Sequence, residues 1–524
     1  MVPPLSRSEL KWVLGYSFAL AAITSLPYLV AGLNQGADWR FTGFLFGVED
    51  GNSYIAKMLA GYQGAWLFRT PYTTVEQVGV LAFLPYLLLG KLAGGSHGPS
   101  ILAFHALRVI ALPLLVLATH RFISQFAVQT RWSRWATVLA TAGGGLGWMA
   151  VVAGEGDWLG SLPLDFYSPE TFGFLAVYGL PHLVLGRAAL LGGFVFYLNP
   201  SRGWAAGGLL LLAGLIHPPS LVSGLAAITA HQIASLGFAS DGSERTAWLR
   251  QFGRSLIPVL PLLAYLGVTY ARDPFLQTWA DQNIIHSPHP LHYLLAFGAV
   301  LPLAIAGAAW LLKRREAALL FPVGWAIVLP VLAYAPVNIQ RRLPEAGWVA
   351  LLVLAALGAQ RLVARWQVLI RVGLTAVLLP STLLILIAGI QTAVRPGLPA
   401  FRPAAEVVAF GWLRNQAVGG EVVLAAYQTS NALPAWSPVR VVAGHGPETP
   451  GLAELTPRVE GFFDVRTTAE ARLSLLKAEQ VEYLFYGPAE RILGGWDPTS
   501  WDCLSPAYAF GAYAIYSTCM RSDA

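Results

Sequence analysis

The chain has 524 residues, of which 55% are hydrophobic and only 12% are charged, and its mean hydropathy is +0.55. A soluble globular chain usually carries about twice that fraction of charged residues, so the composition excludes an ordinary soluble enzyme. The basic residues behind the net charge of +6 are scattered over short segments between apolar runs. This distribution is typical of residues that orient helices in a bilayer, and it argues against a nucleic-acid partner. The sequence therefore predicts a multi-pass membrane protein.

Long apolar runs recur from residue 10 to about residue 391. Each approaches the roughly 20 residues that cross a bilayer as a helix. The first run follows Arg7 and Lys11, is long for the apolar core of a signal peptide, and lacks a small-residue cleavage site, so we expect it to be retained. The fold class that follows is mainly α, a bundle of about 11–13 spans. The candidate spans are 10–33, 76–93, 100–120, 133–153, 172–198, 203–217, 218–238, 254–270, 291–312, 318–335, 347–363 and 368–392.

Positive charge assigns a side of the membrane to most loops. The segments "KRRE" (313–316) and "RTAWLRQFGR" (245–254) are expected in the cytoplasm, which places residues 338–345 and everything after about residue 393 outside. The first loop, 34–75, is also expected outside. Two complete spans between residues 76 and 120 would conflict with this assignment. One segment there is therefore expected to be re-entrant or to lie along the membrane interface.

The character of the chain changes after residue 393. Short strand-like runs such as "VRVVAGH", "VEYLFYG" and "AYAIYS", together with "EVVLAAYQTSNALPAW", alternate with helical patterns in "AAEVVAFGWLRNQ" and "TTAEARLSLLKAE". This alternation predicts a transmembrane domain over 1–392 and a small extracytoplasmic α/β domain over 393–524. The two cysteines, Cys503 and Cys519, both lie in the second domain and are a candidate disulfide, with the pairing left open.

The first loop contains the patterned stretch "FGVEDGNSYIAKMLAGYQGAWLF", residues 46–68. If a helix starts near Asp50, then Asp50, Tyr54 and Lys57 fall on one face. A carboxylate, a phenol and an ammonium would then meet at the membrane surface, next to Glu49. The alternative is that Asp50 is an ordinary N-cap of an amphipathic surface helix.

Several ionisable residues interrupt the apolar runs, where charge is costly. They are expected to line a cavity, or else to bond backbone carbonyls freed beside prolines. The residues in question are His105, Arg108, His182, Arg187 and His217.

Two further patterns lie in loops that are expected outside. Arg341 and Arg342 in "NIQRRLPE" oppose the usual charge bias, and a phosphate is a natural partner for two guanidiniums, with Glu345 as the alternative partner. The loop 154–170 is acidic, with Glu155, Asp157 and Asp165, and this feature alone is a weak sign of function because exposed loops are often acidic. The glycines of "GGGLG" (143–147) are expected to form a close-packing helix face, because no phosphate-loop ending follows them.

These motifs together resemble the GT-C superfamily of integral membrane glycosyltransferases, which includes protein O-mannosyltransferases and lipid A aminoarabinose transferases. The resemblance rests on the acidic pair "ED" (49–50) after the first span, the multi-span body and the C-terminal extracytoplasmic domain. "HALRV", "PHLVLGRA", "NIQRRLPE" and "VAGHGPETP" also look like motifs of uncharacterised bacterial members. The resemblance implies a polyprenyl-phosphate-linked sugar donor, the lipid bilayer as the setting, and the bacterial cytoplasmic (inner) membrane as the location.

The resemblance also implies residue roles. Asp50 is expected to be the catalytic base with Glu49 second, and Glu155 or Asp157 a second-loop acid. Arg341 and Arg342 are expected to hold the donor phosphate, assisted by Lys57. Two close carboxylates could bind a divalent cation, Mg²⁺ or Mn²⁺, and this point stays open.

The expected function is therefore transfer of a sugar from the lipid-linked donor to a glycan, lipid or protein acceptor on the extracytoplasmic side. The alternative is a transporter or flippase of lipid-linked saccharides, although the two related halves that are common in transporters are not visible. Asn431, His445 and Glu448 are expected near strand ends, where they either bind the acceptor or simply belong to loops shaped by glycine and proline.

Overall fold

The computed structural model describes residues 6–239 and 241–521. The chain divides into two compact units. The bundle unit comprises Met1–Leu26, Ala106–Val268 and Ile284–Ala388, and the mixed unit comprises Pro27–His105, Thr269–Asn283 and Gly389–Ala524. The mixed unit therefore joins the first loop to the C-terminal residues, while the domain boundary at residues 392 and 393 stays a prediction.

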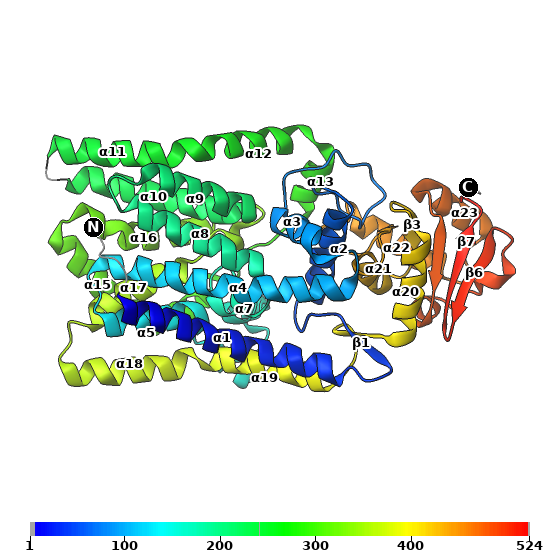
Figure 1. Cartoon of the computed structure of the whole chain (residues 1–524), viewed down its shortest axis with the longest axis horizontal. Helices are drawn as coiled ribbons and strands as arrows, with labels where there is room; N and C mark the ends of the chain where they lie inside the picture. The colour runs from blue at the N-terminus through cyan, green and yellow to red at the C-terminus, as the bar shows by residue number, and fades with distance from the viewer. Residues whose placement is uncertain (1–5, 240, 522–524) are drawn as a thin grey trace. The chain divides into compact units, whose positions relative to one another are not determined.

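The bundle unit is helical among its described residues, and Figure 1 shows α9, α10, α11 and α18 running in nearly the same direction. Its helices are α5 (Thr130–Ala142), α6 (Gly147–Val152), α7 (Gly173–Gly179), α8 (Pro181–Tyr197), α9 (Gly203–Ile216), α10 (Pro218–Phe238), α11 (Gly242–Leu256), α14 (Pro290–Phe297), α15 (Leu301–Arg314), α16 (Phe321–Ala333), α17 (Gly347–Ala359) and α18 (Ala364–Leu378). Single turns of 3₁₀ helix are η1 (Ser124–Phe126), η2 (Trp158–Gly160), η3 (Leu164–Phe166), η4 (Ile257–Val259), η5 (Ala317–Leu320) and η6 (Gln340–Arg342). Four helices contribute residues to both units: α1 (Arg7–Asn34), α4 (His97–Ile123), α12 (Leu260–Arg272) and α19 (Pro380–Val394).

The mixed unit combines helices with two sheets. Its helices are α2 (Val48–Tyr62), α3 (Leu84–Ala93), α13 (Pro274–Gln282), α20 (Ala404–Gln416), α21 (Tyr427–Ala432), α22 (Leu452–Phe462), α23 (Ala469–Glu479), α24 (Pro488–Ile492), η7 (Leu433–Ala435) and η8 (Pro498–Ser500). Its strands are β1 (Trp39–Phe41), β2 (Phe401–Pro403), β3 (Val422–Leu424), β4 (Arg440–Val441), β5 (Tyr483–Tyr486), β6 (Leu504–Phe510) and β7 (Tyr513–Thr518).

Among the described residues, five helical stretches are long and apolar enough to cross a membrane, and a sixth would be α14 with α15, which are bent by 82° against each other. Five more apolar helices are shorter, with 10–17 residues each. The predicted total of 11–13 spans is larger than six, and the difference lies mostly in these shorter helices. The five long stretches are Arg7–Asn34, His97–Phe126, Pro218–Phe238, Gly242–Arg272 and Ala364–Val394.

The span predicted at 76–93 is not formed. Only α3 is helical there, and its 10 residues are fewer than the roughly 20 that a span needs. Val80 instead pairs with Phe68 in an isolated β-bridge. The helix α3 packs so closely on α2 that a Cβ on Gly61 or Gly90 would collide with the facing backbone. The positive-charge rule predicted that one segment between residues 76 and 120 does not cross the membrane as a complete span. That segment is α3, a short helix in contact with α2 of the first loop.

The span predicted at 133–153 is broken by its glycines. Helix α5 ends at Ala142, and α6 begins at Gly147. The backbone N–H groups of Gly145 and Gly147 each donate to the Asp165 carboxylate at 3.1 Å. The expectation that "GGGLG" forms a helix face is therefore wrong, because these glycines leave the helix and let a buried carboxylate approach the backbone.

The larger sheet of the mixed unit has five strands in the order β4-β3-β5-β7-β6. Strand β3 runs parallel to β4 and β5, while β7 is antiparallel to β5 and β6. Side chains alternate between the two faces: Val423 packs against the apolar side of α20, and Leu424 packs toward α22 and α23. Helices on both faces and a mostly buried centre are the α/β arrangement predicted for this region.

The predicted helices at 404–416 and 467–479 are found as α20 and α23. The long strand predicted from "EVVLAAYQTSNALPAW" is wrong beyond Leu424. Its second half forms α21 and η7, where residues 429–435 are buried in succession and Gln428 is exposed, so the two-residue alternation of a half-exposed strand does not apply there.

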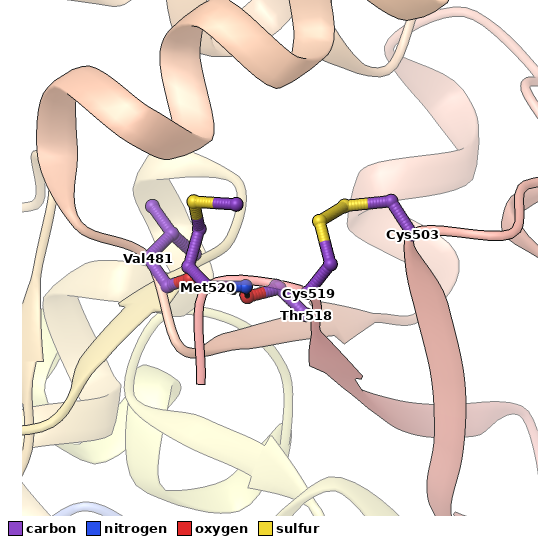
Figure 2. Close-up of a disulfide and its surroundings, with 5 residues drawn as sticks. All are labelled: Val481, Cys503, Thr518, Cys519 and Met520. Carbon is purple, nitrogen blue, oxygen red and sulfur yellow. Dashed lines mark hydrogen bonds between the residues drawn. A yellow bond between two sulfur atoms is a disulfide. The ribbon is translucent and has the colours of Figure 1, made fainter. Parts of the chain in front are cut away.

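The candidate disulfide is confirmed. Cys503 and Cys519 are joined across the ends of β6 and β7, with their Cα atoms 4.9 Å apart (Figure 2). The backbone N–H of Cys519 donates to the Cys503 carbonyl at 2.8 Å, and the Thr518 hydroxyl donates to the Val481 carbonyl beside them at 2.5 Å. The disulfide therefore closes the open end of the terminal hairpin.

Candidate active site

The acidic pair of the first loop begins helix α2. The helix starts at Val48, and Gly47 before it adopts a left-handed conformation with φ 53° and makes no side-chain cap. Glu49 and Asp50 therefore lie in the first turn, where the positive end of the helix dipole stabilises carboxylates. The alternative of Asp50 as N-cap is wrong. Tyr54, predicted on the same face, stacks on Tyr86 with ring centres 4.5 Å apart.

Glu49 is held by two donors from the C-terminal part of the chain. The Gly446 N–H donates to its carboxylate at 2.8 Å, and the Tyr427 hydroxyl donates to the same oxygen. Burial, followed by the neighbouring Glu49 charge, raises the pKa of Tyr427 far above its ordinary value. The tyrosine is therefore a permanent hydrogen-bond donor that fixes the Glu49 side chain.

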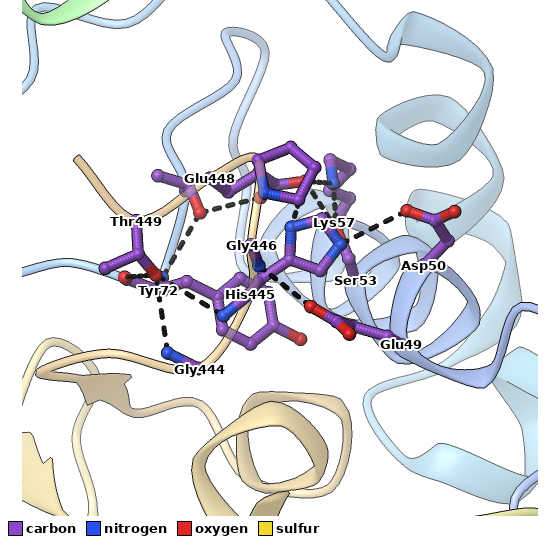
Figure 3. A network of polar contacts seen from close by, with 12 residues as sticks. Glu49, Asp50, Ser53, Lys57, Tyr72, Gly444, His445, Gly446, Glu448 and Thr449 are labelled. Carbon is purple, nitrogen blue, oxygen red and sulfur yellow. Dashed lines mark hydrogen bonds and ion pairs between the residues drawn. The ribbon is translucent and has the colours of Figure 1, made fainter. Parts of the chain in front are cut away.

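Asp50 contacts a histidine that is 395 residues away in sequence (Figure 3). Its Oδ1 lies 3.2 Å from Nε2 of His445, and its side chain is 58% exposed whereas that of His445 is only 2% exposed. The exposed carboxylate is thus in contact with a buried imidazole.

Glu448 faces the Nδ1 side of the His445 ring, and both of its carboxylate oxygens accept hydrogen bonds (Figure 3). Its Oε1 accepts hydrogen bonds from Ser53 at 2.6 Å and Lys57 at 2.5 Å, and its Oε2 accepts one from Thr70 at 2.7 Å. Burial alone would raise the pKa of Glu448, but the Lys57 charge, His445 and these donors together hold it below its ordinary value. Glu448 is therefore a buried, ionised anchor.

Lys57 has a different partner from the one predicted. Its side chain is 1% exposed and forms an ion pair with Glu448. Burial lowers the pKa of Lys57, and Glu448 offsets this only in part. The ammonium is turned inward from the surface of α2, so its assignment as a phosphate ligand has no support in these contacts.

A pocket of about 800 Å³ opens over the two acids. Asn52 and Asn431 line it, with the Asn52 amide donating to the Asn431 side-chain oxygen at 2.8 Å. All of its wall comes from the mixed unit. The other lining residues are Gly47, Val48, Glu49, Asp50, Leu398, Pro399, Arg402, Tyr427, Gln428, Gly446 and Pro447.

Glu49 and Asp50 in this pocket are the two adjacent carboxylates considered as ligands for a divalent cation. Within residues 6–239 and 241–521, no group of three or more His, Cys, Asp or Glu side chains is arranged to hold a metal ion. Glu49 and Asp50 are moreover bound to different partners, Gly446 and His445. The described side chains by themselves therefore do not form a complete ligand set for a resident Mg²⁺ or Mn²⁺.

Arg341 and Arg342 belong to the bundle unit. Arg342 lies 3.4 Å from the Glu170 carboxylate, and the Arg341 guanidinium lies over the Tyr167 ring at 4.3 Å. Arg341 also lines a pocket of about 380 Å³ with Ser161, Tyr167, His286 and Ser287. Glu345, the alternative to a phosphate as their partner, pairs with Arg187, and Arg342 faces Glu170 instead.

Glu345 pairs with Arg187. The Arg187 Nε donates to Glu345 at 2.7 Å, and its Nη2 donates to the Pro169 and Glu170 carbonyls at 2.7 and 2.8 Å. Burial raises the pKa of Glu345 to about 7 despite this partner. Arg187 was expected to line a cavity, and its contacts favour the structural alternative. The second-loop candidates Glu155 and Asp157 are exposed in the bundle unit, and their role stays a prediction.

The remaining predicted cavity residues contact protein groups. His105 lies 3.0 Å from the Gly43 carbonyl, and Arg108, which is buried, bonds Thr24 and Ser25 at 2.9 and 2.8 Å. The rings of His182 and His217 lie 6.0 Å apart, and His217 bonds Ser220. These contacts are structural ones, and none of them identifies a ligand.

The sequence predicted that Asn431, His445 and Glu448 lie near strand ends. It did not predict that they contact residues of the first loop. Strands β3 and β4 are parallel neighbours, so Tyr427 and His445, which follow them, emerge at the same edge of the sheet. The acidic first turn of α2 lies against this edge. Ser53 and Thr70 were missed, since neutral hydroxyl groups give no sequence signal.

No protein-family model matches the chain. No curated protein matches its sequence. Solved structures do match its fold. The oligosaccharyltransferase AglB from Archaeoglobus fulgidus, in complex with an inhibitory peptide and a dolichol-phosphate, has a TM-score of 0.55 at 13% identity, covering 96% of this chain and 73% of that one.

Two other membrane transferases have similar folds. ArnT from Cupriavidus metallidurans in the apo state has a TM-score of 0.51 at 13% identity and covers 98% and 99% of the two chains. The arabinofuranosyltransferase AftD from Mycobacteria has a TM-score of 0.55 at 13% identity and covers 99% of this chain but 42% of that one. The chain therefore has the mainly helical fold of the GT-C membrane glycosyltransferases, with a small C-terminal α/β sheet.

Proposed function

We propose that the protein is a membrane glycosyltransferase that moves a sugar from a polyprenyl-phosphate-linked donor to an acceptor hydroxyl, with Asp50 as the base. The observation that carries this proposal is the exposed carboxylate of Asp50 in a pocket of about 800 Å³, on the first loop of a GT-C fold. A base must reach its proton directly or through one water, and the Asp50 side chain in this pocket is 58% exposed.

The proposed reaction is a single displacement. The acceptor oxygen forms a bond to the anomeric carbon as its proton passes to an Asp50 carboxylate oxygen. The bond between that carbon and the phosphate oxygen breaks, and its electron pair leaves with the lipid phosphate. Inversion at the anomeric carbon follows from one displacement. Glu49, fixed by Tyr427 and Gly446, would bind the donor sugar or the acceptor through its second oxygen.

The donor class is proposed by analogy with the AglB complex, which contains a dolichol-phosphate. Arg341 and Arg342 remain the candidates for the lipid phosphate, because guanidinium groups match phosphate oxygens in pairs. The open pocket lined by Arg341 supports that residue more than it supports Arg342, which already faces Glu170.

We propose an extracytoplasmic reaction in the bacterial cytoplasmic membrane. The disulfide between Cys503 and Cys519 supports an oxidising compartment for the C-terminal region, since disulfides are rare in the cytoplasm. The cytoplasmic assignment of the basic segments 245–254 and 313–316 supports the same orientation.

In the experiment, the purified protein is reconstituted in liposomes. It is then given a panel of undecaprenyl-phosphate-linked sugars, each with a radiolabel on the sugar. We expect wild type to release undecaprenyl phosphate and to pass the label to an added acceptor or to water. Asp50→Asn should lower kcat by about 100-fold or more, while Asp502→Asn, an exposed acid outside the pocket, should leave it unchanged.

Two results would contradict the proposal. Full turnover by Asp50→Asn removes Asp50 as the base. Movement of intact labelled lipid across the liposome membrane, with the sugar still attached, would instead identify the transporter alternative.

A further inference from the structure

We propose that His445 positions Asp50, so that the C-terminal loop 444–449 completes the catalytic centre on the first-loop helix. This inference rests on the proposed function and assigns a further residue to it. His445 itself would touch neither donor nor acceptor in this role, because its side chain is 2% exposed.

The first step concerns the freedom of Asp50. An exposed aspartate normally samples several rotamers, while a base has to meet its proton in one geometry. The contact at 3.2 Å between Nε2 of His445 and Oδ1 of Asp50 ties down one carboxylate oxygen. The second oxygen is then directed by the same bond, so the buried imidazole sets the direction of an exposed carboxylate.

The second step concerns what holds the imidazole. Its ring packs at 5.3 Å from the Tyr72 ring, and the backbone N–H groups of Gly444 and His445 both donate to Thr449 Oγ1 at 3.3 Å. On α13, the Gln282 side chain donates to the Thr449 carbonyl at 2.9 Å. The loop that carries His445 is thus tied at several points.

The third step concerns the far side of the ring. Nδ1 of His445 is buried, has no hydrogen-bond partner among the described residues, and faces Glu448 Oε1 at 3.8 Å. Glu448 is in turn bound by Ser53 and Lys57 of α2. The chain of contacts starts at Asp50 on α2, passes through His445 and Glu448, and returns to α2 (Figure 3).

This closed chain of contacts ties the acid to its support at two ends of the loop. Asp50, Ser53 and Lys57 lie along one side of a single helix, and the loop spans them with His445 at one end and Glu448 at the other. A shift of the loop along α2 would break contacts at both ends. The charged or titratable groups that face His445 are Glu49, Asp50 and Lys57 from α2, Tyr72 from the following loop, and Tyr427 and Glu448 from the C-terminal region.

The test compares three variants of the full-length protein in the same undecaprenyl-phosphate sugar assay. His445→Ala removes the donor and should lower kcat by about 100-fold, with the donor KM changed by less than about twofold. His445→Gln places an amide N–H near the position of Nε2 and should recover about tenfold of that loss. His97→Ala is the matched control: His97 is a buried imidazole of the same unit that bonds the Thr42 and Ala435 carbonyls and stacks on Trp436. It should lower the melting temperature while leaving kcat per folded molecule unchanged.

A second measurement works without turnover. Carbodiimide labelling followed by mass spectrometry reads the reactivity of the Asp50 carboxylate, and His445→Ala should change its rate by about threefold or more while the exposed Asp502 is unaffected. If wild type turns over no donor but this change is seen, the proposed function fails and the positioning role stands. A folded His445→Ala protein with wild-type kcat, an inactive His445→Gln protein, or unchanged Asp50 labelling would each overturn the role of His445.

Discussion

Each unit of this protein contains a buried ion pair whose carboxylate can be compared with the other, and these two pairs behave differently. In the mixed unit Lys57 and Glu448 are 1% and 4% exposed, and in the bundle unit Arg187 and Glu345 are 2% and 0% exposed. The pKa of Glu448 lies below its ordinary value, while that of Glu345 is raised to about 7. Similar burial and similar pairing thus give opposite shifts.

The number of donors explains the difference. Glu448 receives hydrogen bonds from Ser53, Lys57 and Thr70 and has His445 close by. Glu345 has Arg187 alone, its Oε2 has no partner among the described residues, and the Glu170 charge raises its pKa further. An ion pair by itself does not repay the desolvation of a buried carboxylate, whereas several donors do.

The strongest test of this comparison is Lys57→Met. It leaves an ionised Glu448 buried without its counter-charge, and we expect a loss of about 3–5 kcal/mol in the free energy of unfolding. Thermal unfolding of the purified protein, followed by tryptophan fluorescence, measures it. Lys57→Met with Glu448→Leu should recover much of the loss, because a well-packed apolar pair replaces an isolated charge. A single variant as stable as wild type would contradict the ionised anchor.

Arg187→Met should cost less, about 2 kcal/mol at pH 6. Glu345 is largely protonated at that pH, so the variant does not strand a full negative charge and mainly deprives the Pro169 and Glu170 carbonyls of their donor. The same unfolding measurement ranks the two variants directly. A loss equal to that of Lys57→Met at pH 6 would show that Glu345 is ionised like Glu448.

The pH dependence of stability should show the sign of the Glu345 shift. Its pKa is raised from 4.5 to about 7 in the folded protein, so between these values the folded state binds more protons than the unfolded state. Stability is therefore expected to fall as pH rises through this window, by at most about 1.4 kcal/mol per pH unit. Glu345→Gln should flatten this slope when melting temperatures are compared at pH 5, 6 and 7, and an unchanged slope would rule Glu345 out as its source.

Asp50→Asn is expected to change stability least, by less than about 0.5 kcal/mol, because its side chain is 58% exposed. A large loss of turnover at an unchanged melting temperature would separate the proposed base from the buried anchor beneath it. A melting temperature lowered as far as that of Lys57→Met would instead make Asp50 part of the structural network.

Local patterns predicted much of the fold. Helix α20 occupies the predicted residues 404–416, and the two cysteines of the sequence, Cys503 and Cys519, form the candidate disulfide. The patterns failed in α21, whose residues read as a strand although they form a mostly buried helical turn. The prediction of a helix face at glycines 143–145 also failed, since a close-packed helix face and a break between two helices can both be rich in glycine.

The candidate site was only half predictable. Glu49 and Asp50 stand out because carboxylates follow the first apolar run, yet the partner of Asp50 is 395 residues away, and no local pattern encodes that contact. The same holds for Glu345, which was the alternative partner of its sequence neighbours Arg341 and Arg342, whereas the structure pairs it with Arg187. Charge patterns identified the residues, and only the tertiary structure pairs them.

The close contact of α2 with α3 limits which substitutions the two helices tolerate. Gly61 and Gly90 face the backbone of Leu87 and Met58 with no room for a side chain, whereas Gly15 and Gly208 in other helices have open space around them. In a saturation library selected for folded protein, positions 61 and 90 should accept glycine alone, and positions 15 and 208 should accept many residues. The helix that carries Asp50 is therefore held against α3 at two positions, 61 and 90, where only glycine fits.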